Sequence, residues 1–156
     1  MSNIIHRNAV RAILLTPGDE VLLMRIRMRD RGPFWITPGG GIEARESETD
    51  ALIRELKEEV GIEGTEIGAR LFKRDLTFQA GGSLYIQKEA YFAVHVPRFA
   101  PVMSDAQEAT VLDGFRWWKL ADLRETRERI APASLAPRIQ AYLRDGPPDV
   151  LEVVTD

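Results

Sequence analysis

The segment over residues 40–62 constrains the fold of this chain more than any other part of the sequence. It starts with glycines and continues with the spacing of an amphipathic helix. Ser47, followed three residues later by Asp50, is typical of a helix N-cap, and Gly61 is typical of a helix C-terminus. The pattern therefore predicts one helix over residues 47–60.

One side of the predicted helix is apolar, and the adjoining side is acidic. At about 100° per residue, the large apolar side chains fall within an arc of roughly 100°. They are Leu52, Ile53, Leu56 and Val60. Glu55, Glu58 and Glu59 stand at i, i+3 and i+4 and fill the neighbouring arc. We expect the helix to dock on a sheet, with three carboxylates at the edge of the docked face.

Three neighbouring carboxylates favour a bound cation. Like charges at i and i+4 oppose helix formation by roughly a few tenths of a kcal/mol, and partial burial adds to that cost. Carboxylate oxygens suit hard cations, so the sequence predicts Mg²⁺, with Mn²⁺ as the second choice. The alternative is a solvated acidic helix face held by Arg54 and Lys57.

The same segment matches a known pattern, Gly-x5-Glu-x7-Arg-Glu-U-x-Glu-Glu-x-Gly-U, in which U is a bulky aliphatic residue. Every fixed position is filled, by Gly40, Glu46, Arg54, Glu55, Leu56, Glu58, Glu59, Gly61 and Ile62. The segment therefore resembles the Nudix box, and the chain resembles the Nudix hydrolase family. The resemblance implies an α/β fold, a Nudix-like α/β/α sandwich with a mixed β-sheet between helices.

For function, the resemblance implies a pyrophosphohydrolase. Water would attack the pyrophosphate bridge of a nucleoside diphosphate linked to another group X, assisted by a divalent metal. Nucleoside triphosphates, oxidised deoxynucleoside triphosphates, ADP-ribose and dinucleoside polyphosphates all contain such a bridge. Two alternatives stay open: a non-catalytic Nudix-fold module that binds or senses a nucleotide, and a structural domain whose acidic helix binds a partner protein.

The resemblance also assigns roles to the charged residues of the motif. Glu58 and Glu59 are expected to be the principal metal ligands, and Glu55 a third ligand or the base that orients water. Arg54 is expected to fix the glutamates, with Glu46 as a supporting carboxylate. Which of the glutamates accepts the proton stays open.

The glycine run before the helix is a candidate for backbone contacts. Gly39, Gly40 and Gly41 can take positive φ and let the main chain approach an ion or phosphate closely. We expect a main-chain metal ligand at Gly40 or Gly39, and substrate contacts at Gly39 and Gly41. The alternative is an ordinary tight loop between a strand and a helix.

One more acidic ligand is expected outside the box. The resemblance implies that it lies downstream, ahead of a strand that carries tryptophan. Glu108 is the best-placed candidate, with Asp105 and Asp113 as alternatives. A mobile loop at this position would let the carboxylate close on a bound substrate.

Candidate substrate contacts include cations and aromatic rings. Arg25 and Arg27 alternate at the end of an apolar strand, so they are expected to share one face and reach phosphates or a base. The alternative is the solvent side of a sheet. Phe34, Trp35 and Phe78 are candidates for stacking on a nucleobase, with a place in the core as the alternative.

Composition narrows the class of protein. The chain has 156 residues, of which 44% are hydrophobic, and this length suits one domain over residues 1–156. It has no cysteine, which excludes disulfides and thiol nucleophiles. A net charge of -3 gives no general attraction for a nucleic acid polymer, so the expected partner is a small nucleotide. No leader or membrane span is apparent, and we expect a cytoplasmic protein.

Hydrophobic periodicity predicts further strands and helices around the box. Strands are expected over residues 9–15, 21–27, 35–37, 66–78, 83–96 and 115–119, and helices over 121–129 and 134–145. The break at residues 146–148 predicts a C-terminal tail over residues 146–156 that is loose or pairs with a partner subunit in a homodimer.

Overall fold

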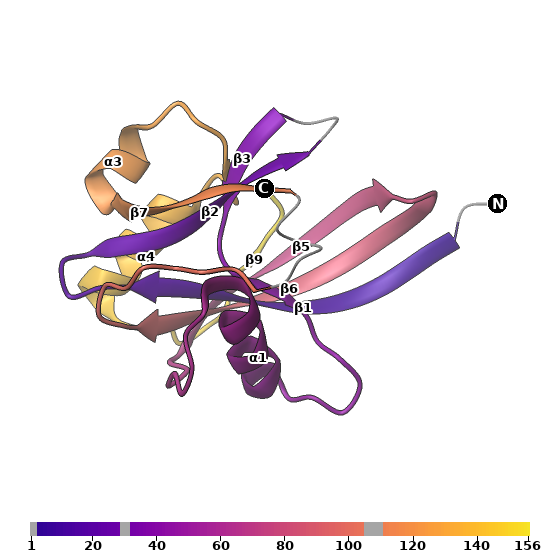
Figure 1. Cartoon of the computed structure of the whole chain (residues 1–156), viewed down its shortest axis with the longest axis horizontal. Helices are drawn as coiled ribbons and strands as arrows, with labels where there is room; N and C mark the ends of the chain where they lie inside the picture. Colours follow the sequence, from indigo (N-terminus) through magenta and orange to yellow (C-terminus); the bar gives the residue numbers. More distant parts are fainter. Residues whose placement is uncertain (1–2, 29–31, 105–110) are drawn as a thin grey trace.

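A computed structural model describes residues 3–28, 32–104 and 111–156 of the chain (Figure 1). Its strands are β1 (Asn3–Leu15), β2 (Glu20–Met28), β3 (Gly32–Ile36), β4 (Gly39–Gly41), β5 (Arg70–Ala80), β6 (Ser83–His95), β7 (Leu112–Lys119), β8 (Ile130–Ala131) and β9 (Val153–Val154). Its helices are α1 (Glu48–Val60), α3 (Leu120–Glu125) and α4 (Leu135–Asp145).

These strands form one mixed sheet in the order β8-β3-β2-β1-β6-β5-β9, with β4 paired to β1 and β7 paired to β2. The pairing of β1 with β6 is parallel along the full length of both strands. Strands β1 and β2 are antiparallel and meet at Leu15 and Val21, while β4 pairs with β1 at residues 9–11. The sheet therefore curls, and β1 and β2 separate from that meeting point onward (Figure 1).

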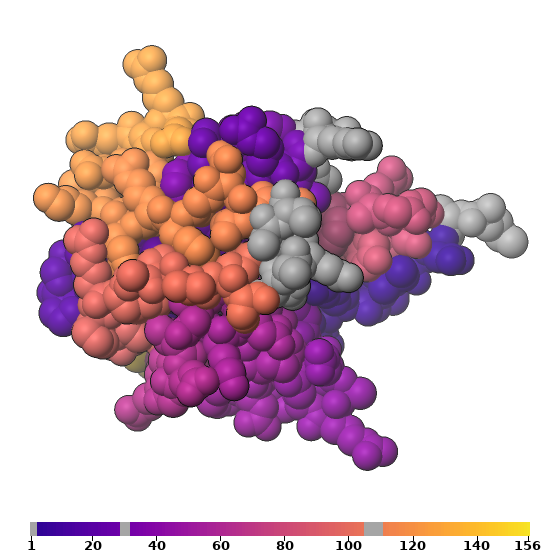
Figure 2. Space-filling view, in the orientation of Figure 1, coloured from indigo at the N-terminus to yellow at the C-terminus, as the bar shows by residue number. Residues whose placement is uncertain are grey.

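Helices cover both faces of the sheet, as the sequence predicted. On one face, α1 packs Leu52, Leu56 and Val60 against Val10 and Leu14 of β1. The other face is covered by α3 and α4, whose core residues are Leu123, Leu135, Ala136 and Ile139. Figure 2 shows the β5–β6 hairpin and the start of β1 projecting beyond this packed body. The predicted α/β sandwich with a mixed sheet is confirmed.

The acidic helix forms where the local signals place it. Ser47 lies just before α1, and its Oγ accepts a 3.0 Å hydrogen bond from the main-chain N–H of Asp50. Gly61 ends the helix with φ +81, a left-handed conformation that glycine adopts without strain. The prediction of a helix over residues 47–60 is confirmed.

Two further segments form short strands that pair within the sheet. The glycine run, for which a tight loop was the alternative, forms the short strand β4 because its backbone pairs with β1. The C-terminal tail, predicted to be loose or to pair with a partner subunit, contains β9, which pairs in parallel with β5 of the same chain. Among the described residues, no helix is long and apolar enough to cross a membrane.

Candidate functional site

Arg54 donates hydrogen bonds to three glutamates of the acidic segment. Its Nε and Nη2 donate to the two carboxylate oxygens of Glu46 at 2.8 and 2.9 Å. Its Nη1 donates to Glu55 at 2.9 Å and to Glu58 at 3.5 Å. Nη2 also donates to the carbonyl oxygen of Gly41 at 3.0 Å. The guanidinium therefore ties α1 to the loop before it and to β4.

The contact with Arg54 changes the pKa of Glu46. The hydrogen bond from Arg54 lowers the pKa of Glu46 from its ordinary 4.5 to about 2, helped by a hydrogen bond from the main-chain N–H of Glu43. Glu46 therefore stays ionised in acid that would protonate an ordinary glutamate. It supports Arg54, which in turn holds Glu55.

Glu59 connects the helix to the glycine strand on the side that faces the sheet. Its side chain is 3% exposed, and Oε2 accepts a 2.7 Å hydrogen bond from the main-chain N–H of Gly39. A carboxylate held by a main-chain donor has few rotamers open to it. Glu59 is therefore fixed at the end of β4.

Gly40 makes room for the carboxylate of Glu55. A Cβ atom at position 40 would lie 2.5 to 2.8 Å from the three carboxylate atoms of Glu55, closer than real Cβ contacts. Glu55 is 8% exposed, so its carboxylate has little space to retreat. The motif needs a glycine here because the helix and β4 touch through this side chain.

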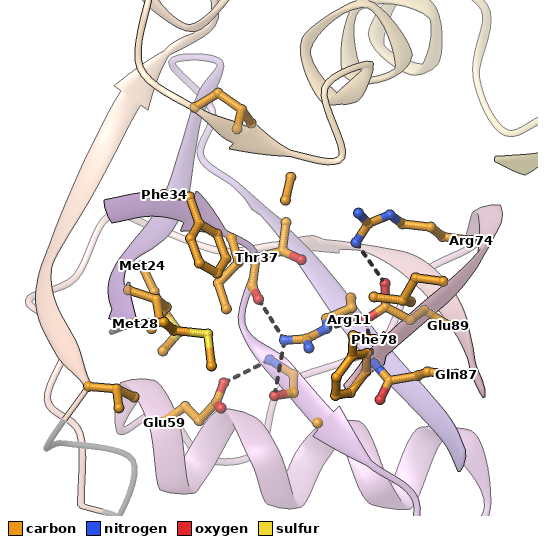
Figure 3. Close-up of a pocket in the computed structure, with 18 of the residues that line it drawn as sticks. Arg11, Met24, Met28, Phe34, Thr37, Glu59, Arg74, Phe78, Gln87 and Glu89 are labelled. Carbon is orange, nitrogen blue, oxygen red and sulfur yellow. Dashed lines mark hydrogen bonds and ion pairs between the residues drawn. The ribbon is translucent and has the colours of Figure 1, made fainter. Parts of the chain in front are cut away.

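A cavity of about 620 Å³ opens beside Glu59, Gly39 and Gly40. It lies between the separated halves of the sheet, so that β1, β5 and β6 line one side while β2 and β3 line the other. Figure 3 shows Met24, Met28 and Phe34 facing Phe78, Gln87 and Glu89 across it. Apolar walls with a few polar groups are typical of a small-molecule site.

The polar part of the wall is built around Glu89, which is 3% exposed. Its Oε2 accepts hydrogen bonds from Nε of Arg11 at 2.9 Å and from Nε2 of Gln87 at 3.0 Å. Its Oε1 accepts from the hydroxyl of Tyr91 at 3.0 Å and from Nη1 of Arg74 at 3.4 Å. Four donors saturate this carboxylate, which makes it an organising group rather than a proton acceptor.

Arg11 links this cluster to the glycine strand (Figure 3). Its Nη1 donates to the carbonyl oxygens of Thr37 at 3.1 Å and Gly39 at 3.4 Å. The same peptide region supplies the N–H that binds Glu59. A continuous set of contacts therefore runs from Glu89 through Arg11 to the acidic helix.

The structure brings most predicted site residues together but separates two of them. Arg25 and Arg27 share a face of β2, as predicted, yet that face is opposite the one on which Met24 and Met28 line the cavity. Both arginines pair with Asp113 of β7, at 2.8 and 3.2 Å. The prediction that they reach substrate is not supported, because the alternation of the strand turns them away.

Other predicted contacts are engaged within the protein or fall outside the structure. The carbonyl of Gly41 is bound by Arg54, and Gly41 does not line the cavity, whereas Gly39 and Gly40 do. Of the aromatic candidates, Phe34 and Phe78 border the cavity, while Trp35 packs edge-on against Trp118 in the core. The predicted ligand Glu108 and its alternative Asp105 lie outside the described residues.

Sequence reasoning missed the polar cluster of Arg11, Arg74, Gln87, Glu89 and Tyr91. The signal that was available is the spacing of residues 87, 89 and 91 in the predicted strand over residues 83–96, which places all three on one face. The two arginines come from other strands, and Arg11 lies 78 residues from Glu89 in the chain.

The donor set of the acidic segment suits a hard divalent cation, although within the described ranges no three acidic or histidine side chains converge as a ready-made site. Glu55, Glu58 and Glu59 offer carboxylate oxygens along one helix, and the carboxylate of Glu55 lies next to Gly40. Mg²⁺ commonly binds through one or two carboxylates and completes its shell with waters and substrate phosphates. The residues present therefore fit a metal that arrives with a phosphate ligand.

A family model described as the NUDIX domain matches residues 5–139 of the chain. The chain is 35% identical over 124 residues to an RNA pyrophosphohydrolase from Marinomonas sp. (strain MWYL1), which covers 72% of this chain and 74% of that protein. It is also 34% identical over 113 residues to an octanoyltransferase from Myxococcus xanthus, covering 68% of this chain but 29% of that relative. The chain therefore spans less than a third of the second relative's length.

Solved structures show the same fold. The NUDIX domain of NrtR from Shewanella oneidensis, complexed with ADP ribose, superposes with a TM-score of 0.67 and covers 89% of each chain. At 20% identity, this likeness concerns the fold alone.

Proposed function

This chain belongs to the Nudix family, and we propose that it is a metal-dependent pyrophosphohydrolase acting on a nucleoside diphosphate linked to a group X. The proposed cofactor is Mg²⁺, with Mn²⁺ as an alternative. The bond cleaved is a phosphoanhydride of the pyrophosphate bridge, and water supplies the new oxygen. A nucleoside triphosphate is the simplest substrate of this kind, and the Marinomonas relative is likewise named as a pyrophosphohydrolase.

The observation that carries the proposal is the position of Glu59. It belongs to the acidic segment, is fixed by the N–H of Gly39, and borders the 620 Å³ cavity. A diphosphate placed along α1 and β4 would lie beside the carboxylates while its organic group enters the cavity. The proposed site thus combines a region that binds the charged diphosphate with a cavity that accepts the organic ring.

Each residue of the proposed site has its own role in binding the metal or in positioning the glutamates. Glu58 and Glu59 are proposed as principal metal ligands, and Glu55 as a third ligand or the base that orients the attacking water. Arg54 positions Glu55 and Glu58 through the contacts described above. When bound, a divalent ion would neutralise phosphate charge and lower the pKa of a coordinated water.

Gly40 completes the proposed site from the main chain, as a ligand to the metal or as the space that admits Glu55. Gly39 contributes through its N–H, which orients Glu59. The nucleotide-sensing module is the second candidate. The observation in its favour is that Arg54 already engages Glu46, Glu55 and Glu58 in the described part of the chain.

Turnover separates the two candidates. The chain is incubated with a nucleotide panel and Mg²⁺, Mn²⁺ or a chelator, and the products are identified by mass. We expect cleavage at the bridge that depends on metal and falls at least about a hundredfold in Glu58→Gln and in Glu59→Gln. The exposed Glu66 provides the matched control, because Glu66→Gln should retain native rates. Binding of nucleotide without any cleavage would establish the sensing module instead.

A further inference from the structure

Two polar atoms in the wall of the cavity are buried and lack a hydrogen-bond partner in the structure. They are Oε1 of Gln87 and Oγ1 of Thr37, in side chains that belong to residues 4% and 1% exposed. Across the described residues there are four such side-chain atoms, and these two line the same cavity. An unpaired buried polar group is unfavourable, so a ligand that supplies the missing hydrogen bond gains affinity.

The amide of Gln87 is held in one orientation. Its Nε2 donates to Oε2 of Glu89 at 3.0 Å. Rotating the amide by half a turn would place its oxygen against a carboxylate oxygen, so that two acceptors would face each other. The donor end of Gln87 is therefore committed to Glu89, while its acceptor end has no hydrogen-bond partner among the described residues, and Gln87 lines the cavity.

Glu89 can enforce this orientation because it stays ionised. Burial alone would favour the neutral acid, but the charges of Arg11 and Arg74 and the hydrogen bonds from Arg11 and Tyr91 outweigh it and lower the pKa of Glu89. An ionised carboxylate accepts hydrogen bonds and donates none. It accordingly requires the NH₂ group of Gln87 on its side.

The remaining walls suit a flat ring. Phe34 and Met28 on one side and Phe78 and Leu76 on the other bring apolar surface to the cavity. A ring between these walls presents its edge to the polar end, where Gln87 offers an acceptor. A base with an N–H at that edge would satisfy this acceptor, whereas a base without one would leave it unpaired.

We propose that Gln87 is a specificity-determining residue, whose Oε1 accepts a hydrogen bond from an N–H group of the substrate's base, and that Glu89 is the positioning residue that fixes this acceptor. This inference rests on the proposed function for the identity of the ligand as a nucleotide. It extends that function by naming the group through which the ring is selected.

Equilibrium binding without metal tests the inference separately from catalysis. Nucleoside 5′-monophosphates are compared in matched pairs by titration calorimetry in a chelator. Each pair differs in one N–H donor: adenosine with purine riboside, cytidine with 2-pyrimidinone riboside, guanosine with N1-methylguanosine, and uridine with N3-methyluridine. For the base that binds best, removing the donor should raise the Kd at least about tenfold.

Variants at position 87 test whether Gln87 causes this difference in Kd. In Gln87→Met, which keeps the side-chain length without the acceptor, the two members of the pair should bind within about threefold of each other. Gln140→Met on α4, outside the cavity, should keep the native ratio. Thermal unfolding confirms that each variant is folded, and Gln87→Leu serves as the second variant if Gln87→Met is not.

Three outcomes overturn the inference. They are equal binding within every pair by the native chain, a donor effect that persists without Gln87, and no binding of any monophosphate at millimolar concentration. The proposed function fails on a different result, which is the absence of metal-dependent cleavage in the substrate panel.

Discussion

The main-chain N–H of Gly39 lies 2.7 Å from Oε2 of Glu59, and this hydrogen bond joins the glycine strand to the acidic helix at the edge of the cavity. It relates the residue just before the box to a glutamate of the box that lies 20 residues further along the chain. Because Arg11 holds the carbonyl of Gly39 from the other side, the position of the carboxylate depends on the sheet as well as on the helix.

Gly40→Ala should disturb the site directly. The added Cβ would lie within 2.8 Å of the carboxylate of Glu55, so that side chain or β4 must move. We expect a loss of about 1–3 kcal/mol in the free energy of unfolding and a fall in kcat/KM on the order of tenfold or more. Gly18→Ala is the control, because its Cβ would meet its nearest neighbour at 3.8 Å. Equal effects of the two substitutions on urea unfolding would contradict the packing argument.

Arg54→Lys tests the contacts of the guanidinium. Lysine keeps the charge but lacks the planar fork that binds both oxygens of Glu46 while reaching Glu55 and Gly41. We expect the free energy of unfolding to fall by about 1–3 kcal/mol and kcat to fall with it. Arg124→Lys on the exposed side of α3 should be neutral. A fully active and stable Arg54→Lys protein would show that charge alone suffices.

Stability at acidic pH should report on Glu46. Its pKa is about 2 in the folded state against an ordinary 4.5, so its ionised form stabilises the fold above pH 4.5. That contribution is lost as the pH falls from about 4.5 through about 2. Urea unfolding of Glu46→Gln should therefore depend less on pH in this window than the native protein does, while Glu66→Gln should follow the native curve. Identical slopes in all three proteins would refute the assignment.

Arg27→Ala should leave substrate binding almost unchanged. The side chain is 62% exposed and pairs with Asp113 on the face of β2 away from the cavity. We expect KM to change less than about twofold and the free energy of unfolding by less than about 1 kcal/mol. A tenfold rise in KM would show that Arg27 contacts the substrate and would contradict its assignment to the face of β2 away from the cavity.

Local signals made the acidic helix predictable. The cap at Ser47, the stop at Gly61 and the apolar spacing all act within a few residues, and the structure follows them. The family pattern then pointed to Glu55, Glu58 and Glu59 as a group, which α1 places on one helix.

Contacts between strands of the sheet could not be predicted from the sequence. That Arg25 and Arg27 share a face follows from the period of a strand, but which face borders the cavity depends on how β1 and β2 separate. The pairing of Arg11 with Glu89 joins strands far apart in the chain, and no local spacing encodes it. The glycine strand β4 could not be predicted either, because it forms by pairing with β1, which is distant in the sequence.

The most direct measurement of the central claim is hydrolysis of the preferred nucleotide in ¹⁸O-labelled water, with phosphate products analysed by mass spectrometry. The account predicts one ¹⁸O atom in a single phosphate-containing product, formed with Mg²⁺ or Mn²⁺ but not with a chelator, and at least about a hundredfold more slowly in Glu59→Gln. Label incorporation at equal rates without metal, or in Glu59→Gln, would contradict it.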